Sequence, residues 1–294
     1  MAEITREGVS LSTFQGEPIT REPRHITWDA LTAQKGGYKH FLLKEIHEQP
    51  QAIIDTMRGR LLVNEGDVSL GEIEQHAEVL DAIKRITLVA CGTAWHSCLV
   101  GKFFLEELAR IPVEVDYGSE FRYRRSPISP DTLVLAVSQS GETADTLAAL
   151  EGGKAGGART MAICNVVDSS IPRKADMTIY THAGPEMSVA STKAFTTQVT
   201  ALYLLAVHLG RRRGVLDQVT SRKLIEDLVN LPNQVREVLS KDKLIEKIAK
   251  KYGHARDFLY LGFNEDEAHR KVFDAVQIVI PGTHRLLANV EFAD

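Results

Sequence analysis

The side chains best suited to bind a ligand in this sequence are hydroxyl groups that follow an apolar segment of strand length. Ser138 to Thr143, reading Ser-Gln-Ser-Gly-Glu-Thr, stand between that segment and a helical pattern. Unpaired N–H groups at a helix start attract anions, and the hydroxyls of Ser138, Ser140 and Thr143 add further donors. Gly141 lets the backbone approach an anion closely. The run has no lysine or arginine, so it would hold a phosphate through dipoles and hydroxyls. The alternative is that Ser140 or Thr143 only caps the helix.

Two further turns could contribute to the same ligand. Thr93 lies in residues 91–94 (Cys-Gly-Thr-Ala), which also join an apolar strand pattern to a helix. Its hydroxyl either reaches the ligand or caps the helix. In the third turn, residues 186–193, Ser191 and the backbone near Val189 are suited to hydrogen-bond sugar hydroxyls.

The other reactive residues do not belong to a recognisable catalytic or cofactor-binding motif. Lys193 either contacts the ligand or pairs with a carboxylate at the surface. Cys91 lacks a neighbouring base, and a small buried thiol is the commoner role. The run Arg122–Arg125 is more typical of an interface or a solvated loop than of a catalytic patch. Residues 91–93 contain one glycine where a GxGxxG dinucleotide motif needs three, which argues against a nucleotide cofactor.

Alternating strand and helix patterns position these turns. The sequence predicts strands at 86–90, 113–117, 132–137, 160–164 and 177–180, and helices at 95–110, 144–155 and 193–209. Apolar strands separated by helices indicate a parallel sheet covered on both faces, and ligands bind such sheets at the carboxyl ends of the strands. The predicted fold class is therefore α/β, a three-layer doubly wound parallel sheet with the hydroxyl turns at its ligand-binding edge.

The flanking segments have different patterns. Residues 1–30 read as short β-structure, and helical spacing on both sides of Pro50 predicts two short helices within residues 31–62. These segments make a short N-terminal β/helical extension.

The C-terminal part begins with a helical pattern over residues 221–252, interrupted at 231–233. A strand at 258–261 then resembles the start of a second unit. One helix at 265–275 and one strand at 276–280 follow, so we expect a C-terminal stub of a second unit.

Composition excludes several classes of function. The 294 residues carry a net charge of −4 and a pI near 6.2, without a basic bias towards nucleic acid or an anionic membrane. The three cysteines have no CxxC or Cys/His spacing, which favours a reducing cytoplasm over a disulfide framework or a zinc site. The N-terminus lacks an apolar signal region, and the apolar stretch 201–209 is too short to span a membrane. We expect a cytoplasmic protein with no metal or other cofactor.

Two longer motifs are specific to one family. Ser138 begins Ser-Gln-Ser-Gly-Glu-Thr-Ala-Asp-Thr-Leu, and Val189 begins Val-Ala-Ser-Thr-Lys-Ala-Phe-Thr. Both resemble the sugar isomerase (SIS) domain of the glutamine–fructose-6-phosphate aminotransferase (isomerizing) family, also called glucosamine-6-phosphate synthase. Segments 37–60 and 119–124 are similar to that family as well, so the resemblance covers about residues 3–262.

The resemblance implies a site for a sugar phosphate, either fructose 6-phosphate or glucosamine 6-phosphate. The residues that match the family's phosphate- and sugar-binding positions are Thr93, Ser138, Gln139, Ser140, Thr143, Val189 (through its backbone) and Ser191. Ala94 departs from the family, which usually has a serine there. One lost neutral hydrogen bond weakens binding by about 1 kcal/mol.

The resemblance also implies how the chain is divided. The expected parts are the tail of a glutaminase domain at 1–35, linker helices at 36–60, a first SIS domain at 61–215, and a helical linker with a truncated or divergent second SIS unit at 216–294. The family's glutaminase nucleophile and isomerase acid/base residues find no match, so we assign no catalytic residue and expect a sugar-phosphate-binding part of such an enzyme. The alternative is a non-enzymatic sugar-phosphate sensor or interaction module. Because two SIS units normally bury each other's faces, we also expect a homo-oligomer, most simply a dimer.

Overall fold

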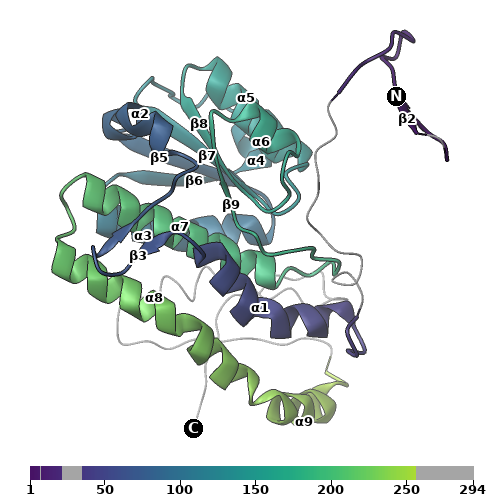
Figure 1. Cartoon of the computed structure of the whole chain (residues 1–294), viewed down its shortest axis with the longest axis vertical. Helices are drawn as coiled ribbons and strands as arrows, with labels where there is room; N and C mark the ends of the chain where they lie inside the picture. Colours follow the sequence, from purple (N-terminus) through teal and green to yellow (C-terminus); the bar gives the residue numbers. More distant parts are fainter. Residues whose placement is uncertain (7, 22–34, 256–294) are drawn as a thin grey trace.

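The computed structural model describes residues 1–6, 8–21 and 35–255, and its centre is a five-stranded parallel sheet (Figure 1). The strand order is β6-β5-β7-β8-β9. The strands are β5 (Arg85–Ala90), β6 (Val113–Tyr117), β7 (Thr132–Ser138), β8 (Arg159–Cys164) and β9 (Met177–Tyr180). The chain moves outwards in opposite directions from β5 and β7, which are neighbours, so the order reverses between them. This reversal is the point at which doubly wound sheets bind ligands.

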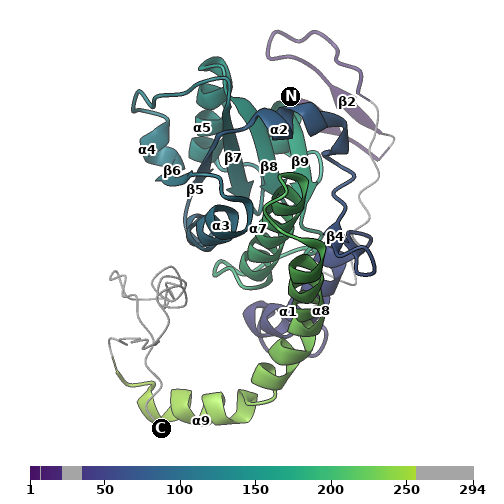
Figure 2. The ribbon, with the colours of Figure 1, turned by 90° about the vertical axis from the view of Figure 1, so that its left-hand side faces the viewer.

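Helices cover both faces of the sheet, because its strands are apolar on both sides. In β7, alternate side chains from Leu133 to Val137 enter two different cores. One core includes side chains of α3 (Thr93–Ala109) and α7 (Lys193–Arg212), and the other includes side chains of α5 (Ala144–Ala155). Figure 2 shows α3 and α7 below the sheet and α5 on its other side. Since successive side chains of a strand point to opposite faces, this is the three-layer α/β fold that the sequence predicts.

Two long helices extend the α7 side of the molecule. α1 (Phe41–Met57) contributes Ile53 and Met57 to the larger core, and α8 (Gln218–Leu239) contributes Ile225 and Leu228. The remaining elements are β1 (Ala2–Ile4), β2 (Val9–Leu11), β3 (Leu61–Leu62), β4 (Asp67–Val68), the 3-10 helix η1 (Glu74–His76), α2 (Ala77–Ala82), α4 (Gly118–Phe121), α6 (Ser170–Lys174) and α9 (Asp242–Tyr252).

The prediction of two short helices around Pro50 is wrong, because α1 is one helix that continues through this proline. A proline has no N–H group, so Pro50 cannot donate to the carbonyl of Ile46 four residues earlier. The side-chain amide of Gln49 donates to that carbonyl at 2.9 Å instead. Burial of Pro50, together with this replacement bond, keeps the helix continuous.

The predicted interruption at residues 231–233 is also wrong. α8 begins at Gln218 and continues through the buried Pro232 to Leu239. Its N-terminus is capped by Asp217, whose carboxylate accepts a 2.8 Å hydrogen bond from the N–H of Thr220. Packing of α8 against the larger core through Ile225 and Leu228 outweighs the local preference of proline for a helix end.

The other predicted elements differ from the structure by a few residues at their ends. α3 begins at Thr93 instead of 95, and α7 continues past 209 to Arg212. The short β-structure expected near the N-terminus is the antiparallel pair of β1 and β2. The predicted strands and helix within 258–280 lie outside the described residues.

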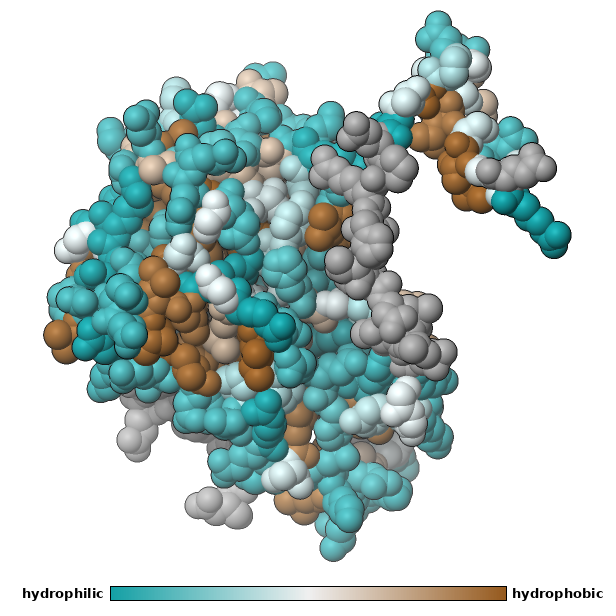
Figure 3. Space-filling view, viewed as in Figure 1, coloured by the Kyte–Doolittle hydropathy of each residue, from teal (hydrophilic) through white to brown (hydrophobic). Residues whose placement is uncertain are grey.

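The face seen in Figure 3 is mostly hydrophilic, with apolar side chains gathered in a few places. Within the described ranges, no helix has the length and apolar character needed to cross a membrane.

Candidate functional site

A cavity of about 200 Å³ opens at the carboxyl ends of β5 and β7. It brings together all seven of the residues expected from the sequence, and its lining is Cys91, Thr93, Ala94, Val137, Ser138, Gln139, Ser140, Thr143, Glu186, Ser188, Val189, Ser191 and Gln198. Val89 of β5 pairs with Ala136 of β7, so the turns that follow these strands start side by side. None of the described lining residues is a lysine or an arginine.

The turn after β7 depends on Gly141. Its φ of +67° lies in the left-handed region, which favours glycine. A Cβ atom at this position would lie 1.9 Å from Ser169 Oγ and 2.7 Å from Cys164 Sγ. The Gly141 carbonyl accepts a 2.9 Å hydrogen bond from the N–H of Ile171. This turn is therefore fixed between β7 and the start of α6, and the residues from Ser138 to Thr143 form a defined cradle.

The hydroxyls of the cradle are not used to cap α5. Ser138 Oγ accepts a 3.0 Å hydrogen bond from the N–H of Gly141, and Ser140 Oγ accepts one of 3.2 Å from the N–H of Glu142. Thr143 is the N-cap residue of α5, but its side chain makes no capping hydrogen bond. The capping alternative for Thr143 is therefore wrong, and its hydroxyl faces the cavity 3.4 Å from Ser138 Oγ.

The turn after β5 adds Thr93 to the cavity. Gly92, with φ +61° and ψ −136°, is the N-cap residue of α3, and Thr93 is the first residue of that helix. The interpretation of Thr93 as a capping residue is therefore wrong. Ala94, where the related family usually has serine, lies in the same wall of the cavity.

The third wall is the segment between β9 and α7. Glu186 receives hydrogen bonds from the N–H groups of Thr192 at 2.9 Å and Ala194 at 3.2 Å, and so covers the N-terminus of α7. Ser191 Oγ donates to the other oxygen of the Glu186 carboxylate at 3.1 Å. The side chain of Val189 is fully exposed, which leaves its backbone as the part suited to face a ligand.

This geometry agrees with comparisons to known proteins. A SIS-domain family model matches residues 80–208. These residues form a SIS domain. The resemblance inferred from the motifs at Ser138 and Val189 is confirmed, and so is the fold class.

Relatives of the SIS domain and its flanks are aminotransferases. The glutamine–fructose-6-phosphate aminotransferase (isomerizing) of Clostridium tetani is 49% identical over 265 residues, 90% of this chain and 43% of that protein. The one from Symbiobacterium thermophilum is 47% identical over 268 residues, 91% of this chain and 44% of that protein. The solved C-terminal domain of glucosamine-fructose-6-phosphate aminotransferase from Francisella tularensis has a TM-score of 0.76 at 35% identity, covering 82% of this chain and 65% of that one. The chain spans less than half the length of the curated relatives and is homologous to their isomerase half.

Lys193 does not line the cavity of the SIS domain. Its side chain is buried, and its Nζ lies 2.7 Å from Glu48 Oε2 of α1. Of the two alternatives for Lys193, pairing with a carboxylate is correct. The pair is buried instead of lying at the surface, because α1 covers the start of α7.

Sequence reasoning missed several lining residues of the SIS domain. Glu186 and Ser188 belong to the third motif, but the pattern alone does not show which of its side chains turn inwards. Gln198 comes from α7, and its Oε1 accepts a 3.1 Å hydrogen bond from Ser97 Oγ of α3. Its position in the cavity follows from the packing of two helices, for which a single sequence has no signal.

Two titratable groups beside the turn after β7 have shifted pKa values. Glu142 points to the start of α6, where hydrogen bonds from the Ser170 side chain and N–H hold the pKa of its carboxyl below the usual value. Burial raises the pKa of the Cys164 thiol, which lies beneath Gly141. In the described part of the chain, no group of three or more His, Cys, Asp or Glu side chains is arranged to hold a metal ion.

Proposed function

We propose that the SIS domain of this chain binds a hexose 6-phosphate, fructose 6-phosphate or glucosamine 6-phosphate, as part of a glutamine–fructose-6-phosphate aminotransferase (isomerizing). The observation that carries the proposal is one cavity lined by hydroxyls from three turns at the switch point of the sheet. The names of the aminotransferase relatives supply the substrate. The reaction of such an aminotransferase belongs to amino sugar biosynthesis.

The phosphate is assigned to the cradle formed by Ser138, Gln139, Ser140 and Thr143. Hydroxyl and N–H groups can hold an anion here because the N-terminus of α5 carries a partial positive charge. Each hydrogen bond to a charged group contributes about 1.5–3 kcal/mol. Several such bonds together support binding without a lysine or arginine in the described lining.

The sugar is assigned to the other two walls. Because Gly92 is the N-cap residue of α3, the hydroxyl of Thr93 is not needed as a helix cap and can bind a sugar hydroxyl beside the cradle. The backbone at Val189 lines the same space. Ser191 Oγ lies 3.1 Å from Glu186, so a sugar hydroxyl would join an existing hydrogen-bond pair. We assign no catalytic residue, metal or cofactor.

The expected domain bounds remain part of this proposal: 1–35 as a glutaminase-domain tail, 36–60 as linker helices, 61–215 as the SIS domain and 216–294 as a helical linker with a second unit. We also propose a cytoplasmic location, which is compatible with three free cysteines. A homodimer would cover the apolar side chains exposed along the end of α8 and α9, which are Val238, Leu244, Ile245, Ile248 and Tyr252.

The test is a thermal-shift titration of the chain with fructose 6-phosphate and glucosamine 6-phosphate. We expect saturable stabilisation, because a ligand stabilises the state to which it binds, by about 2.7 kcal/mol at a hundredfold excess over Kd. The double variant Ser140→Ala/Thr143→Ala should lose this shift. Ser10→Ala/Thr13→Ala, in β2 and just after it, makes the same chemical change away from the cavity and should keep the shift.

A folded protein that responds to neither sugar would contradict the proposal. A shift that survives in Ser140→Ala/Thr143→Ala would contradict the assignment of the phosphate to the cradle. In the first case the interaction-module alternative would take precedence.

A further inference from the structure

The wall of the cavity between β9 and α7, residues 181–192, has no regular secondary structure. The middle of this segment also lacks apolar packing, since the side chain of Met187 is 58% exposed and that of Val189 fully exposed. Ser188, Val189 and Ser191 nevertheless line the cavity. Polar contacts must therefore determine where this wall lies.

Helix α1 provides such contacts at the start of the segment, in its middle and just after its end. Thr56 Oγ1 donates a 2.5 Å hydrogen bond to the carbonyl of Thr181 at the start of the segment. Glu45 contacts its middle, and Glu48 pairs with Lys193 immediately after its end. Residues three, four or eleven apart lie on nearly the same face of a helix. One face of α1 thus lies alongside the wall.

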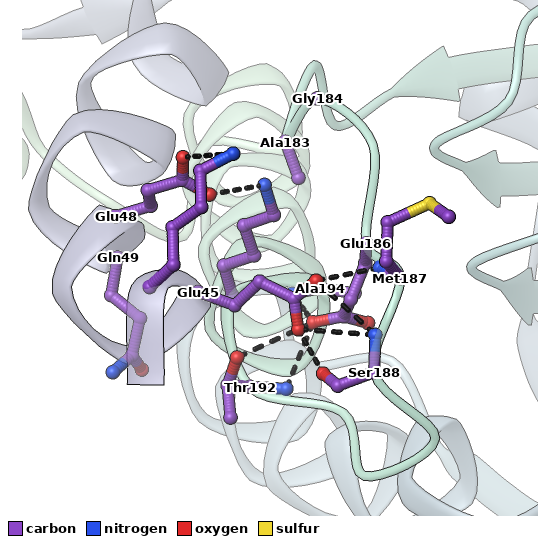
Figure 4. Close-up of polar contacts among 12 residues, drawn as sticks. Glu45, Glu48, Gln49, Ala183, Gly184, Glu186, Met187, Ser188, Thr192 and Ala194 are labelled. Carbon is purple, nitrogen blue, oxygen red and sulfur yellow. Dashed lines mark hydrogen bonds and ion pairs between the residues drawn. The ribbon is translucent and has the colours of Figure 1, made fainter. Parts of the chain in front are cut away.

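The carboxylate of Glu45 makes the central contact (Figure 4). Its Oε1 accepts hydrogen bonds from the N–H groups of Met187 at 2.6 Å and Ser188 at 3.2 Å, and its Oε2 accepts from the N–H of Ser188 at 3.3 Å and from the Ser188 hydroxyl. The side chain of Glu45 is only 2% exposed. A buried carboxylate is costly unless donors surround it. Within the described chain the donors to Glu45 come from this wall, so moving the wall away would leave the charge unpaired.

The phosphate cradle is anchored without α1, although one of its anchor residues, Asn165, also holds Ala183 and Gly184 at the start of the wall through its side chain. The carbonyl of Gln139 accepts hydrogen bonds at 3.3 Å from the N–H groups of Asn165 and Val166, and the carbonyl of Gly141 accepts from Ile171 at 2.9 Å. These anchors belong to the segment after β8, and none involves α1. Loosening the wall should therefore leave the cradle in place.

We propose that Glu45 is a positioning residue that holds Ser188, Val189 and Ser191 against the sugar, without itself touching the ligand. The proposal rests on the proposed function, because it concerns the sugar side of the same site. Glu45 would thus raise the affinity for a sugar phosphate but leave the affinity for phosphate alone unchanged.

The experiment compares Glu45→Ala and Glu45→Gln with Gln51→Ala, which changes an exposed residue of the same helix. Hydrogen–deuterium exchange of the unliganded chain reports on residues 185–192 and on the cradle. Titrations with fructose 6-phosphate and with inorganic phosphate report on the whole site and on the cradle alone. We expect Glu45→Ala to speed exchange in 185–192 only, and to weaken fructose 6-phosphate binding about tenfold, the equivalent of one hydrogen bond.

Inorganic phosphate should bind wild type and Glu45→Ala equally well. Glu45→Gln keeps one acceptor oxygen, so its exchange rate and affinity should lie between those of wild type and Glu45→Ala; it also serves if Glu45→Ala does not fold. Wild-type exchange in 185–192 of both Glu45 variants would overturn the proposal. An equal loss of affinity for both ligands would also overturn it, since that outcome indicates a general loss of structure. If wild type binds no sugar phosphate, the proposed function fails, while the exchange measurement still decides whether Glu45 holds the wall.

Discussion

Substitution of Gly141 by alanine tests whether the cradle is as tightly constrained as the structure indicates. An alanine in the left-handed region costs about 1–2 kcal/mol. The new Cβ would also lie 1.9 Å from Ser169 Oγ and 2.7 Å from Cys164 Sγ, so neighbouring atoms must move. Overpacking of this kind costs about 1–3 kcal/mol. We therefore expect Gly141→Ala to lower the free energy of unfolding by about 2–5 kcal/mol.

The assay is thermal and urea unfolding with two matched controls. At about 2–4 °C per kcal/mol for a domain of this size, the Tm of Gly141→Ala should fall by about 4–20 °C. Gly157 has φ +92°, but a Cβ atom there would meet nothing within 4 Å, so Gly157→Ala isolates the backbone cost. Gly152 lies in α5 with open space around it, and Gly152→Ala should stabilise the protein by up to about 1 kcal/mol.

The comparison between Gly141→Ala and Gly157→Ala decides whether the cradle is rigid. If both lower the stability equally, the contact with Ser169 relaxes at no cost, and the cradle is not rigid. A larger loss for Gly141→Ala together with loss of sugar-phosphate binding would support a preformed cradle.

Two other predictions concern the sheet and the assembly. Burial raises the pKa of Asp176, but hydrogen bonds from Lys154 and Thr160 outweigh it and hold that pKa below the ordinary 3.8. The carboxylate therefore stabilises the fold above about pH 4, and this stabilisation is lost as the pH falls through the folded-state pKa. Asp176→Asn should have a lower Tm at pH 7 and a flatter Tm profile between about pH 5 and 3, and an unchanged profile would refute this. Light scattering should give the mass of a dimer, and Ile245→Glu on α9 should shift it towards the monomer. A monomeric wild type with a sharp unfolding transition would contradict the assignment of α9 to an interface.

The sheet and its binding edge could be predicted because the local signals agree with the fold. An apolar run such as β7, followed by a glycine-containing turn, is typical of a buried strand that leads into a helix, and the place of Ser138 and Thr143 follows from this pattern. The helix boundaries at Pro50 and Pro232 could not be predicted in this way. At Pro50 the side chain of Gln49 replaces the missing hydrogen bond, and at Pro232 tertiary packing outweighs propensity.

The position of the wall between β9 and α7 could not be predicted from the sequence. Ser191 and Val189 could be identified because they belong to a motif. Glu186 of that motif fixes its end next to α7, but nothing in the motif fixes its middle around Ser188. Glu45, which holds the middle of that wall, is more than 140 residues away in the chain. Lys193 was open to two interpretations for the same reason, because its partner Glu48 lies on the same distant helix. The turns of a parallel sheet are thus set by local chemistry, whereas the wall that completes the cavity depends on α1. Substitutions of the polar residues of α1 that contact the wall should therefore change which ligands the site accepts before they change whether the sheet folds.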